Sequence, residues 1–500
     1  MEFSLLANEY WWGGMVEKGI EMPFHQQSKV CLDLRRTDHY NQVSPFFLSS
    51  RGRILWSQKP FSATFDKGKV FVDGIAQLET VGNCLREAYL YGASHCFPFA
   101  SNIPDAMFFS APQYNTWIEL MHDQNQEAII AYARNIIAHG MPPGILMIDD
   151  GWALDYGEFT FHPGKFSNPK KMVETLHEMG FWVMLWVCPY VSPDSPVFRE
   201  LQAQDYLILR QDGKPAAGCW WNGISAGIDL FSEEAVGWFT GKLKKMMQEY
   251  GIDGFKFDGG DMEFYASAEA PEKPWHYTEK YGLLGEVFAF NEYRAAWNLG
   301  GKPLVMRLSD KQHSWTENGI NTLLPNSLVQ GLLGYTYHCP DMIGGGEIHS
   351  FHQNRHCLDQ ELVVRYAQAS ALCPMMQFSA APWRVLDEKH FEMVQKMVSL
   401  HQKMGEYIVG LAQHSARTCE PIMRHMAYEF PDAGCETIQD QFMLGSKILV
   451  APILKKGERS RSVYLPEGIW RRNDNAVMRG GREITMDAPL NTLLYFERGE

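Results

Sequence analysis

The sequence predicts an α/β fold built on a (β/α)8 TIM barrel, with an N-terminal β-sandwich-like region before it and a C-terminal antiparallel β domain after it. Short alternating apolar runs broken by turns fill residues 1–112, which is typical of antiparallel strands. Across residues 113–405, apolar strands alternate with helical stretches, which indicates parallel β/α units. In residues 406–500 the helical rhythm stops and strand-like runs return.

The middle region contains eight β/α units, and eight units predict a closed barrel. We expect its strands at Asn115–Leu120, Ile145–Asp149, Trp182–Val187, Gly254–Asp258, Glu292–Ala296, Leu304–Leu308, Gly334–His338 and Pro374–Phe378. Helical periodicity is clearest at Gln126–His139, Asn168–Met179, Ser232–Tyr250 and Asp359–Leu372. The loop near residues 192–228 is too long for a minimal barrel connection, so we expect a small insertion over the site.

Composition narrows the class of ligand. The net charge of −14, without clustered Lys and Arg, argues against nucleic acid. No apolar run approaches the roughly 18 residues that span a bilayer, and the first residues do not resemble a signal peptide, so we expect no membrane contact. The ten cysteines form no CxxC pair, which favours reduced thiols and a cytoplasmic location. Small neutral molecules remain as the possible class of ligand. The fifteen Trp could stack on the C–H faces of sugars, or they could simply fill a large core.

Carboxylates recur where the predicted barrel strands end. In a barrel of this kind, functional side chains stand at the carboxyl ends of the strands. The strand-end residues and their neighbours form the candidate site: Asp149, Asp150, Trp186, Lys256, Asp258, Arg307, Asp310, His338 and Asp341. Helix capping alone does not account for so many acids, arginines and tryptophans on one face. We therefore expect a functional site at this rim.

Asp258 is the most informative of these residues. Lys256 and Asp258 share one face of their strand, and a lysine beside an aspartate keeps it ionised. The glycines that follow leave room for a ligand, so the aspartate suits a nucleophile. The competing interpretation is an Asp that caps the next helix. As a nucleophile, Asp258 would supply, together with Asp310, the two carboxylates that glycoside hydrolysis requires.

Several helper residues keep two interpretations. Asp150 is either a helix cap or a ligand, and His338 either binds substrate or is a core histidine. Arg307 either contacts substrate or pairs with a rim carboxylate, and Trp186, like Trp152, is either a wall of the site or core. For two acids just past Asp258, a solvated or indirect role is favoured: Asp261 and Glu263.

A metal site is the other chemistry that clustered acids suggest. Lys256 and the arginines would lie in the same cavity and repel a cation. The mixture of acids, bases and aromatic rings fits a polyol better, so we expect no metal and no cofactor. The expected partner is a small saccharide.

Several motifs together resemble glycoside hydrolase family 31, over most of the chain. They are Phe255-Lys256-Phe257-Asp258-Gly259-Gly260-Asp261, Asp341-Met342-Ile343-Gly344-Gly345, Pro421-Ile422-Met423-Arg424, Asp440-Gln441-Phe442-Met443-Leu444-Gly445 and Leu449-Val450-Ala451-Pro452. Within the family, the pattern is similar to the myogenesis-regulating branch and its bacterial relatives, which act as α-galactosidases. The residues behind this finer resemblance are Ile148–Trp152, Leu185–Val187, Trp220–Gly223 and Arg307–Asp310, with Ser314 and Trp315 following.

The resemblance implies a role for five residues. Asp258 would be the nucleophile and Asp310 the general acid/base, although Arg307-Leu308-Ser309-Asp310 departs from the family's usual context for that acid. Arg294 would bind substrate, Asp149 would bind hydroxyls at the closed end of the sugar subsite, and Trp221 would shape that subsite. A retaining exo-acting α-galactosidase is therefore the leading expectation, and a homo-oligomer is expected as its assembly.

Three rival functions stay open. The same chemistry on an α-glucoside or α-xyloside differs only in side-chain placement. The second is a sugar-binding protein or chaperone that has the same barrel but hydrolyses its ligand weakly. A metal-dependent barrel isomerase is the third.

Overall fold

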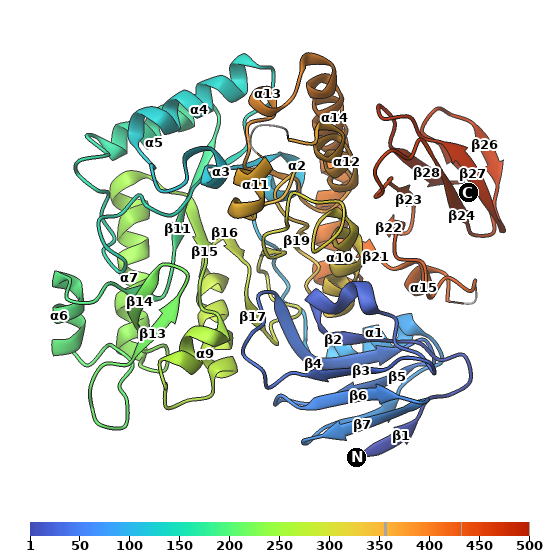
Figure 1. Cartoon of the computed structure of the whole chain (residues 1–500), viewed down its shortest axis with the longest axis horizontal. Helices are drawn as coiled ribbons and strands as arrows, with labels where there is room; N and C mark the ends of the chain where they lie inside the picture. Colours follow the sequence, from blue (N-terminus) through green and yellow to red (C-terminus); the bar gives the residue numbers. More distant parts are fainter. Residues whose placement is uncertain (355–357, 432, 500) are drawn as a thin grey trace.

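A computed structural model describes residues 1–354, 358–431 and 433–499 of the chain (Figure 1). Eight parallel strands form the central barrel in chain order. They are β9 (Gln113–Asn115), β10 (Ile145–Ile148), β11 (Trp182–Val187), β15 (Gly254–Phe257), β16 (Phe290–Tyr293), β18 (Met306–Arg307), β19 (His338–Cys339) and β20 (Gln377–Phe378). β20 pairs with β9, and a bridge between Met342 and Gln377 closes the ring. The predicted barrel is confirmed.

Helices surround the barrel between its strands. The main ones are α4 (Gln126–Ala138), α5 (Pro169–Glu178), α7 (Glu233–Tyr250), α9 (Pro274–Leu283), α10 (Leu323–Leu332), α12 (Gln360–Ser370) and α14 (Glu388–Thr418). Ser232 caps α7 and Asp359 caps α12 by accepting a hydrogen bond from a backbone amide of the first turn. Within the described residues, no helix is long and apolar enough to cross a membrane.

Two sequence expectations about elements are wrong. Residues 116–120 do not extend the first strand, because the Asn115 side chain accepts a hydrogen bond from the Trp117 amide and the chain turns into α3 (Trp117–Leu120). The helices do not end near residue 406 either. α14 keeps buried residues at helical spacing through Ile408, Ala412 and Ser415, and it ends where Cys419 adopts a left-handed conformation.

The N-terminal region forms two antiparallel sheets packed against the barrel. One contains β1 (Glu2–Ser4), β7 (Lys69–Asp73), β6 (Ser62–Asp66) and β3 (Val30–Asp33). The other contains β2 (Trp11–Met15), β4 (Gln42–Ser49), β5 (Arg53–Trp56) and β8 (Gln77–Thr80). β17 (Ala296–Trp297) follows the fifth barrel strand and pairs with β4, so it joins the barrel to this sheet.

The C-terminal region is antiparallel and has its own apolar core, which includes Leu449, Trp470 and Phe496. Its larger sheet contains β21 (Met423–Arg424), β22 (Phe442–Leu444), β23 (Ile448–Ala451), β28 (Leu494–Arg498), β25 (Ile469–Arg472) and β26 (Val477–Arg479). A separate pair is formed by β24 (Ser460–Leu465) and β27 (Arg482–Asp487).

The long loop after the third barrel strand forms a small unit of its own. α6 (Pro196–Ala203) precedes a hairpin of β13 (Ala217–Trp220) and β14 (Gly223–Gly227), and β14 also pairs with β12 (Tyr190–Val191). The tip of this hairpin carries Trp221 and Asn222. These two residues contact the barrel rim, as described next.

Candidate active site

A rigid glycine turn holds Asp258 at the end of β15. Gly259 and Gly260 both have positive φ, at 69° and 70°, and a Cβ on Gly260 would lie 2.3 Å from the Tyr281 ring. The Gly260 amide donates to the Tyr190 hydroxyl at 2.7 Å. The next helix, α8 (Met262–Ser267), begins after Asp261, so Asp258 does not serve as its cap.

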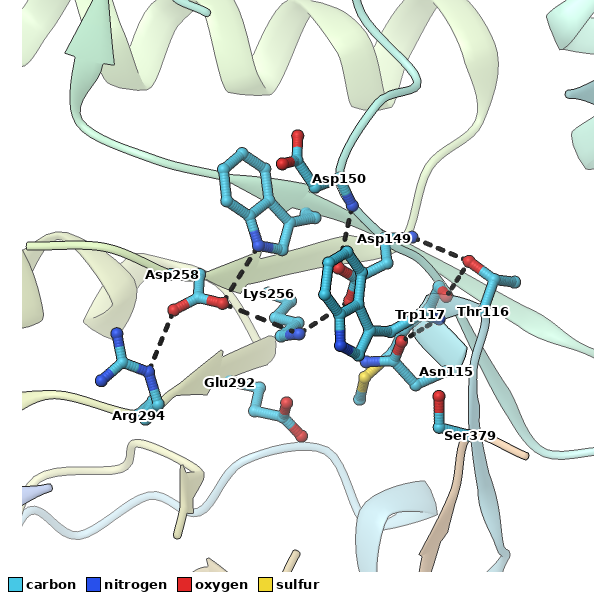
Figure 2. A network of polar contacts seen from close by, with 12 residues as sticks. Asn115, Thr116, Trp117, Asp149, Asp150, Lys256, Asp258, Glu292, Arg294 and Ser379 are labelled. Atoms are coloured by element: carbon cyan, nitrogen blue, oxygen red, sulfur yellow. Dashed lines mark hydrogen bonds and ion pairs between the residues drawn. The ribbon is translucent and has the colours of Figure 1, made fainter. Parts of the chain in front are cut away.

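Three donors surround the carboxylate of Asp258. Trp186 Nε1 donates to Oδ2 at 3.1 Å, Arg294 Nε donates to Oδ1 at 3.3 Å, and Lys256 Nζ lies 3.8 Å from Oδ2 (Figure 2). Burial alone would raise the pKa of this carboxyl, but the charges of Arg294 and Lys256 outweigh it and hold the pKa well below its usual range. Asp258 is therefore an anion throughout the ordinary pH range.

Lys256 joins Asp258 to the end of β10, which lies two strands away from β15. Its ammonium donates to Asp149 Oδ2 at 2.7 Å, and both side chains are buried. Burial opposes the charge of Lys256, but Asp149 and Asp258 together raise its pKa. The Asp149 carboxylate points toward Lys256, whereas the carboxylate of Asp150 points away from it (Figure 2).

Arg294 links the site to two other parts of the chain. Its guanidinium donates to both oxygens of Asp261, at 2.9 and 2.7 Å, and to the Tyr40 carbonyl of the N-terminal region at 2.8 Å. The ring of Trp221, which is 54% exposed, lies 5.3 Å from the Arg294 guanidinium carbon. Asp261 is itself buried, so of the two roles expected for it, solvated or indirect, its contacts with Arg294 fit the indirect one.

Arg307 organises the second group of carboxylates. Its Nη1 donates to Asp310 Oδ1 and to Asp341 Oδ1, each at 2.7 Å. Asp341 is fully buried and also accepts from the Lys311 amide at 2.7 Å, whereas the Asp310 side chain is 37% exposed. Burial raises the pKa of Asp341, and Arg307 counters it. Asp310 thus remains open to a ligand while one oxygen is fixed.

A buried glutamate, Glu292, was missed by the sequence reasoning. It accepts from Gln377 Nε2 at 2.7 Å and lies 3.5 Å from Arg307 Nε. Burial raises the pKa of Glu292, whereas Arg307 and Lys256 lower it. One signal was available, because Glu292 precedes Arg294 by two positions and so shares its strand face.

The structure brings most of the predicted site residues together. One group contains Asp149, Trp186, Lys256, Asp258, Arg294 and Trp221, and another contains Arg307, Asp310 and Asp341. Two do not join them. His338 is fully buried, its Nδ1 donates to the Tyr335 carbonyl at 3.0 Å, and burial lowers its pKa to about 4, so the substrate-contact expectation is wrong. Asp150 instead binds Tyr156 and Asn222.

Two models of one protein family match this chain. The model of the glycosyl hydrolases family 31 TIM-barrel domain matches residues 109–314, and that of the glycosyl hydrolase family 31 C-terminal domain matches residues 419–500. The chain belongs to glycoside hydrolase family 31. The resemblance inferred from the sequence motifs is thereby confirmed.

Curated relatives agree with this family. The chain is 30% identical to the mouse myogenesis-regulating glycosidase over 475 residues, covering 91% of this chain and 66% of the relative. It is 25% identical to the alpha-xylosidase XylQ of Lactiplantibacillus pentosus, covering 85% of this chain and 58% of that protein. The chain therefore spans about two thirds or less of the length of these two relatives.

Solved structures of the family share the fold. A dextranase from Flavobacterium johnsoniae in complex with glucose has a TM-score of 0.83 at 20% identity, covering 100% of this chain and 66% of the dextranase. An alpha-xylosidase from a soil metagenome in complex with xylose has the same TM-score and identity, covering 99% of this chain and 79% of the xylosidase.

Proposed function

We propose that this member of glycoside hydrolase family 31 is a retaining, exo-acting α-glycosidase. One observation carries the proposal: a buried carboxylate, Asp258, is held as an anion by Arg294, Lys256 and Trp186, while a second and more exposed carboxylate, Asp310, stands two barrel strands away. A permanent anion suits a nucleophile, and an accessible acid suits proton transfer.

The proposed reaction has two displacements. In the first, an oxygen of Asp258 attacks the anomeric carbon while protonated Asp310 gives its proton to the departing glycosidic oxygen. This leaves a glycosyl ester on Asp258, an alcohol as the released leaving group, and an ionised Asp310. In the second, Asp310 takes a proton from water, the water oxygen attacks the anomeric carbon, and the ester bond to Asp258 breaks.

The surrounding side chains prepare this chemistry. Trp186 and Arg294 each donate to a different oxygen of Asp258, so they fix the orientation of the carboxylate before substrate arrives. Arg307 does the same for one oxygen of Asp310. Asp149 and Lys256 present a buried acceptor and donor pair that suits sugar hydroxyls. Trp221 offers an exposed ring as a wall for the sugar.

An α-galactoside is the proposed substrate. The support is the similarity of the motifs around Asp149, Trp221 and Asp310 to the α-galactosidase branch of the family. An α-glucoside or α-xyloside is the second candidate, because relatives at lower identity carry the names alpha-xylosidase and alpha-glucosidase. The sugars differ in the 4-hydroxyl and in the C6 group, and discrimination between them depends on placement within about 1 Å.

A panel of nitrophenyl α-glycosides tests this function. The α-galactoside, α-glucoside, α-xyloside and α-N-acetylgalactosaminide are assayed with the wild-type chain and with Asp258→Asn. We expect the highest kcat/KM on the α-galactoside and no release by the variant. Absence of turnover on every glycoside would favour a sugar-binding protein, and turnover that a chelator leaves unchanged would dismiss the metal-dependent isomerase.

We also propose a cytoplasmic location, because two of the free cysteines, Cys31 and Cys219, are exposed and a reducing compartment would protect them. Cell fractionation tests this proposal. Recovery of the protein in a secreted or periplasmic fraction would contradict it. Homo-oligomerisation remains a prediction, which light scattering of the purified chain checks.

A further inference from the structure

A cavity of about 420 Å³ lies beside the proposed sugar site. Its walls come mainly from the loop after β10 and the end of β11. They include Asp150, Trp152, Tyr156, Glu158, His162 and Trp186. Trp186, Val187 and Cys188, which lie beside Asp258, belong to this lining, whereas Asp258, Asp310 and Arg294 do not. The cavity is therefore a chamber next to the site and separate from its catalytic carboxylates.

Three side chains at the edge of this chamber are hydrogen-bonded to one another: Asp150, Tyr156 and Asn222, here called the end wall; the first two line the chamber. Asn222 Nδ2 donates to Asp150 Oδ2 at 2.7 Å and to the Tyr156 hydroxyl at 2.8 Å. The Tyr156 hydroxyl donates to the same Asp150 oxygen at 3.0 Å. The end wall thus ties the loop after β10 to the tip of the β13–β14 hairpin.

Aromatic rings support the end wall. The Tyr156 ring lies 4.8 Å from Trp220 and 5.9 Å from Trp186, and the rings of Trp186 and Trp220 are nearly parallel at 6.4 Å. The next residue of the hairpin, Trp221, covers Arg294. The hairpin tip therefore reaches from the end wall to the guanidinium that binds Asp258.

The barrel order decides which end of the sugar meets the end wall. Asp150 follows β10, the second strand of the ring, and Asp310 follows β18, the sixth. The two residues therefore lie on opposite sides of the barrel. In the proposed reaction the leaving group sits next to Asp310. The opposite end of the sugar ring, with C4 and C6, then faces β10 and the end wall.

We propose that the end wall determines exo specificity, and that the chamber behind it accepts the preceding hexose of a longer chain once the wall is opened. The proposal rests on the proposed function. In the intact protein the end wall blocks any substituent on O4 or O6 of the bound sugar. The hydrolase then removes single terminal sugars.

The chamber has the chemistry and size for a hexose. Its lining combines hydrogen-bonding groups on Asp150, Glu158 and His162 with the ring surfaces of Trp152 and Trp186. Such a mixture suits the hydroxyls and C–H faces of a sugar. Its volume of about 420 Å³ lies within the range of roughly 300–1,000 Å³ that is usual for small-molecule pockets.

Tyr156→Ala removes the largest part of the end wall and is the decisive variant. It is assayed with two substrates: the nitrophenyl α-hexoside and the nitrophenyl glycoside of the matching disaccharide, linked through O4 or O6. Galactose and glucose series are run in parallel. The wild type should release nitrophenol from the disaccharide glycoside only after a lag, because the terminal hexose must leave first. The variant should release nitrophenol and intact disaccharide without a lag.

We expect Tyr156→Ala to raise the ratio of initial rates, disaccharide over monosaccharide, by roughly tenfold or more, since pocket shape commonly discriminates at this level. Leu154→Ala is the matched control, because Leu154 lines the chamber but makes none of the end-wall contacts described above. Tyr156→Phe, which removes a hydroxyl with little change in volume, and Asn222→Ala, which removes the smaller carboxamide, should give smaller rises in the same direction.

Two results would overturn the proposal. One is a folded Tyr156→Ala protein that keeps the wild-type lag and ratio. The other is a ratio that rises equally in Leu154→Ala. If Tyr156→Ala does not fold, the ratio in Asn222→Ala decides in the same way. A wild type without turnover on any hexoside would instead refute the proposed function, so the two failures can be told apart.

Discussion

Asp261 holds Arg294 through both carboxylate oxygens, at 2.9 and 2.7 Å, and Arg294 in turn donates to Asp258. The pair is buried, so its geometry fixes a positive charge beside the proposed nucleophile. Removing one partner of a buried ion pair commonly costs about 3–5 kcal/mol, because the other charge stays buried without compensation. Asp261 is therefore a positioning residue that acts through Arg294.

We predict that Asp261→Asn lowers both the melting temperature and kcat/KM. The neutral amide keeps the shape but loses the charge that holds the guanidinium, so Arg294 can turn away from Asp258. Thermal unfolding and steady-state kinetics measure the two effects. Asp194→Asn, at an exposed ion pair with Arg199, is the control and should change neither. Unchanged kinetics in Asp261→Asn would show that Arg294 needs no such anchor.

Lys256→Met should move the acidic limb of the kcat/KM profile to higher pH. Arg294 and Lys256 depress the pKa of Asp258 in the folded protein, so Asp258 becomes protonated only well below the usual range. Without the ammonium, this pKa rises, and activity falls at a higher pH as the solution is acidified. Lys256→Arg keeps the charge and serves as the comparison. An acidic limb that stays in place in Lys256→Met would exclude this electrostatic role.

Asp310→Ala should slow hydrolysis by roughly 10²–10⁴-fold, which is the usual contribution of a general acid/base. The loss should be smaller for nitrophenyl glycosides, because a good leaving group needs less protonation. Azide should restore turnover of such activated substrates and yield a glycosyl azide of α configuration, because it displaces the β-linked ester on Asp258 with inversion. Failure of azide to rescue the variant would place the acid/base on another residue.

Asp150→Asn should stabilise the fold above about pH 6. Burial, followed by the charge of Asp149, raises the pKa of Asp150 from 3.8 to about 6. The stability that this group contributes is fully present below the unfolded pKa and is lost as pH rises through the folded pKa. The amide escapes that loss, and the gain should reach about 3 kcal/mol at pH 8, because the pKa is raised from 3.8 to about 6 and one pKa unit is about 1.4 kcal/mol.

Denaturant unfolding at pH 8 and pH 4 measures this gain, which should be close to zero at the lower pH. The amide oxygen can still accept from Asn222 and Tyr156, so the end wall keeps its contacts. An equal gain at both pH values would show that the effect does not come from ionisation of Asp150.

Much of this fold was predictable because buried parallel strands leave a plain signal. The runs that contain β10 and β11 are continuously apolar, and β10 and β15 are each followed directly by an aspartate, so both the barrel and its rim follow from the sequence. The end of the first strand was mispredicted because a local hydrogen bond stops the strand at Asn115. The apolar residues after Asn115 suit a strand equally well. The Asn115 side chain, however, accepts a hydrogen bond from the Trp117 amide, and the chain turns into α3.

The residues of the site were predictable to about the same extent as the fold. The charged residues that follow strands, such as Asp258 and Asp310, could be placed at one rim by topology alone. Topology alone could not show which of these side chains are in contact. His338 and Asp150 also follow strand ends, but one is buried beneath the rim and the other turns toward Tyr156 and Asn222. Such orientations depend on side-chain contacts between segments that are distant in the chain.

The most direct test of the central claim is covalent trapping. A fluoroglycoside of the preferred sugar, which forms the glycosyl enzyme faster than water can hydrolyse it, is incubated with the protein, and the labelled peptide is sequenced by mass spectrometry. The account predicts one β-linked sugar on Asp258, in the peptide that contains Phe257 and Gly259. A label on any other residue, or steady turnover without a trapped ester, would contradict it.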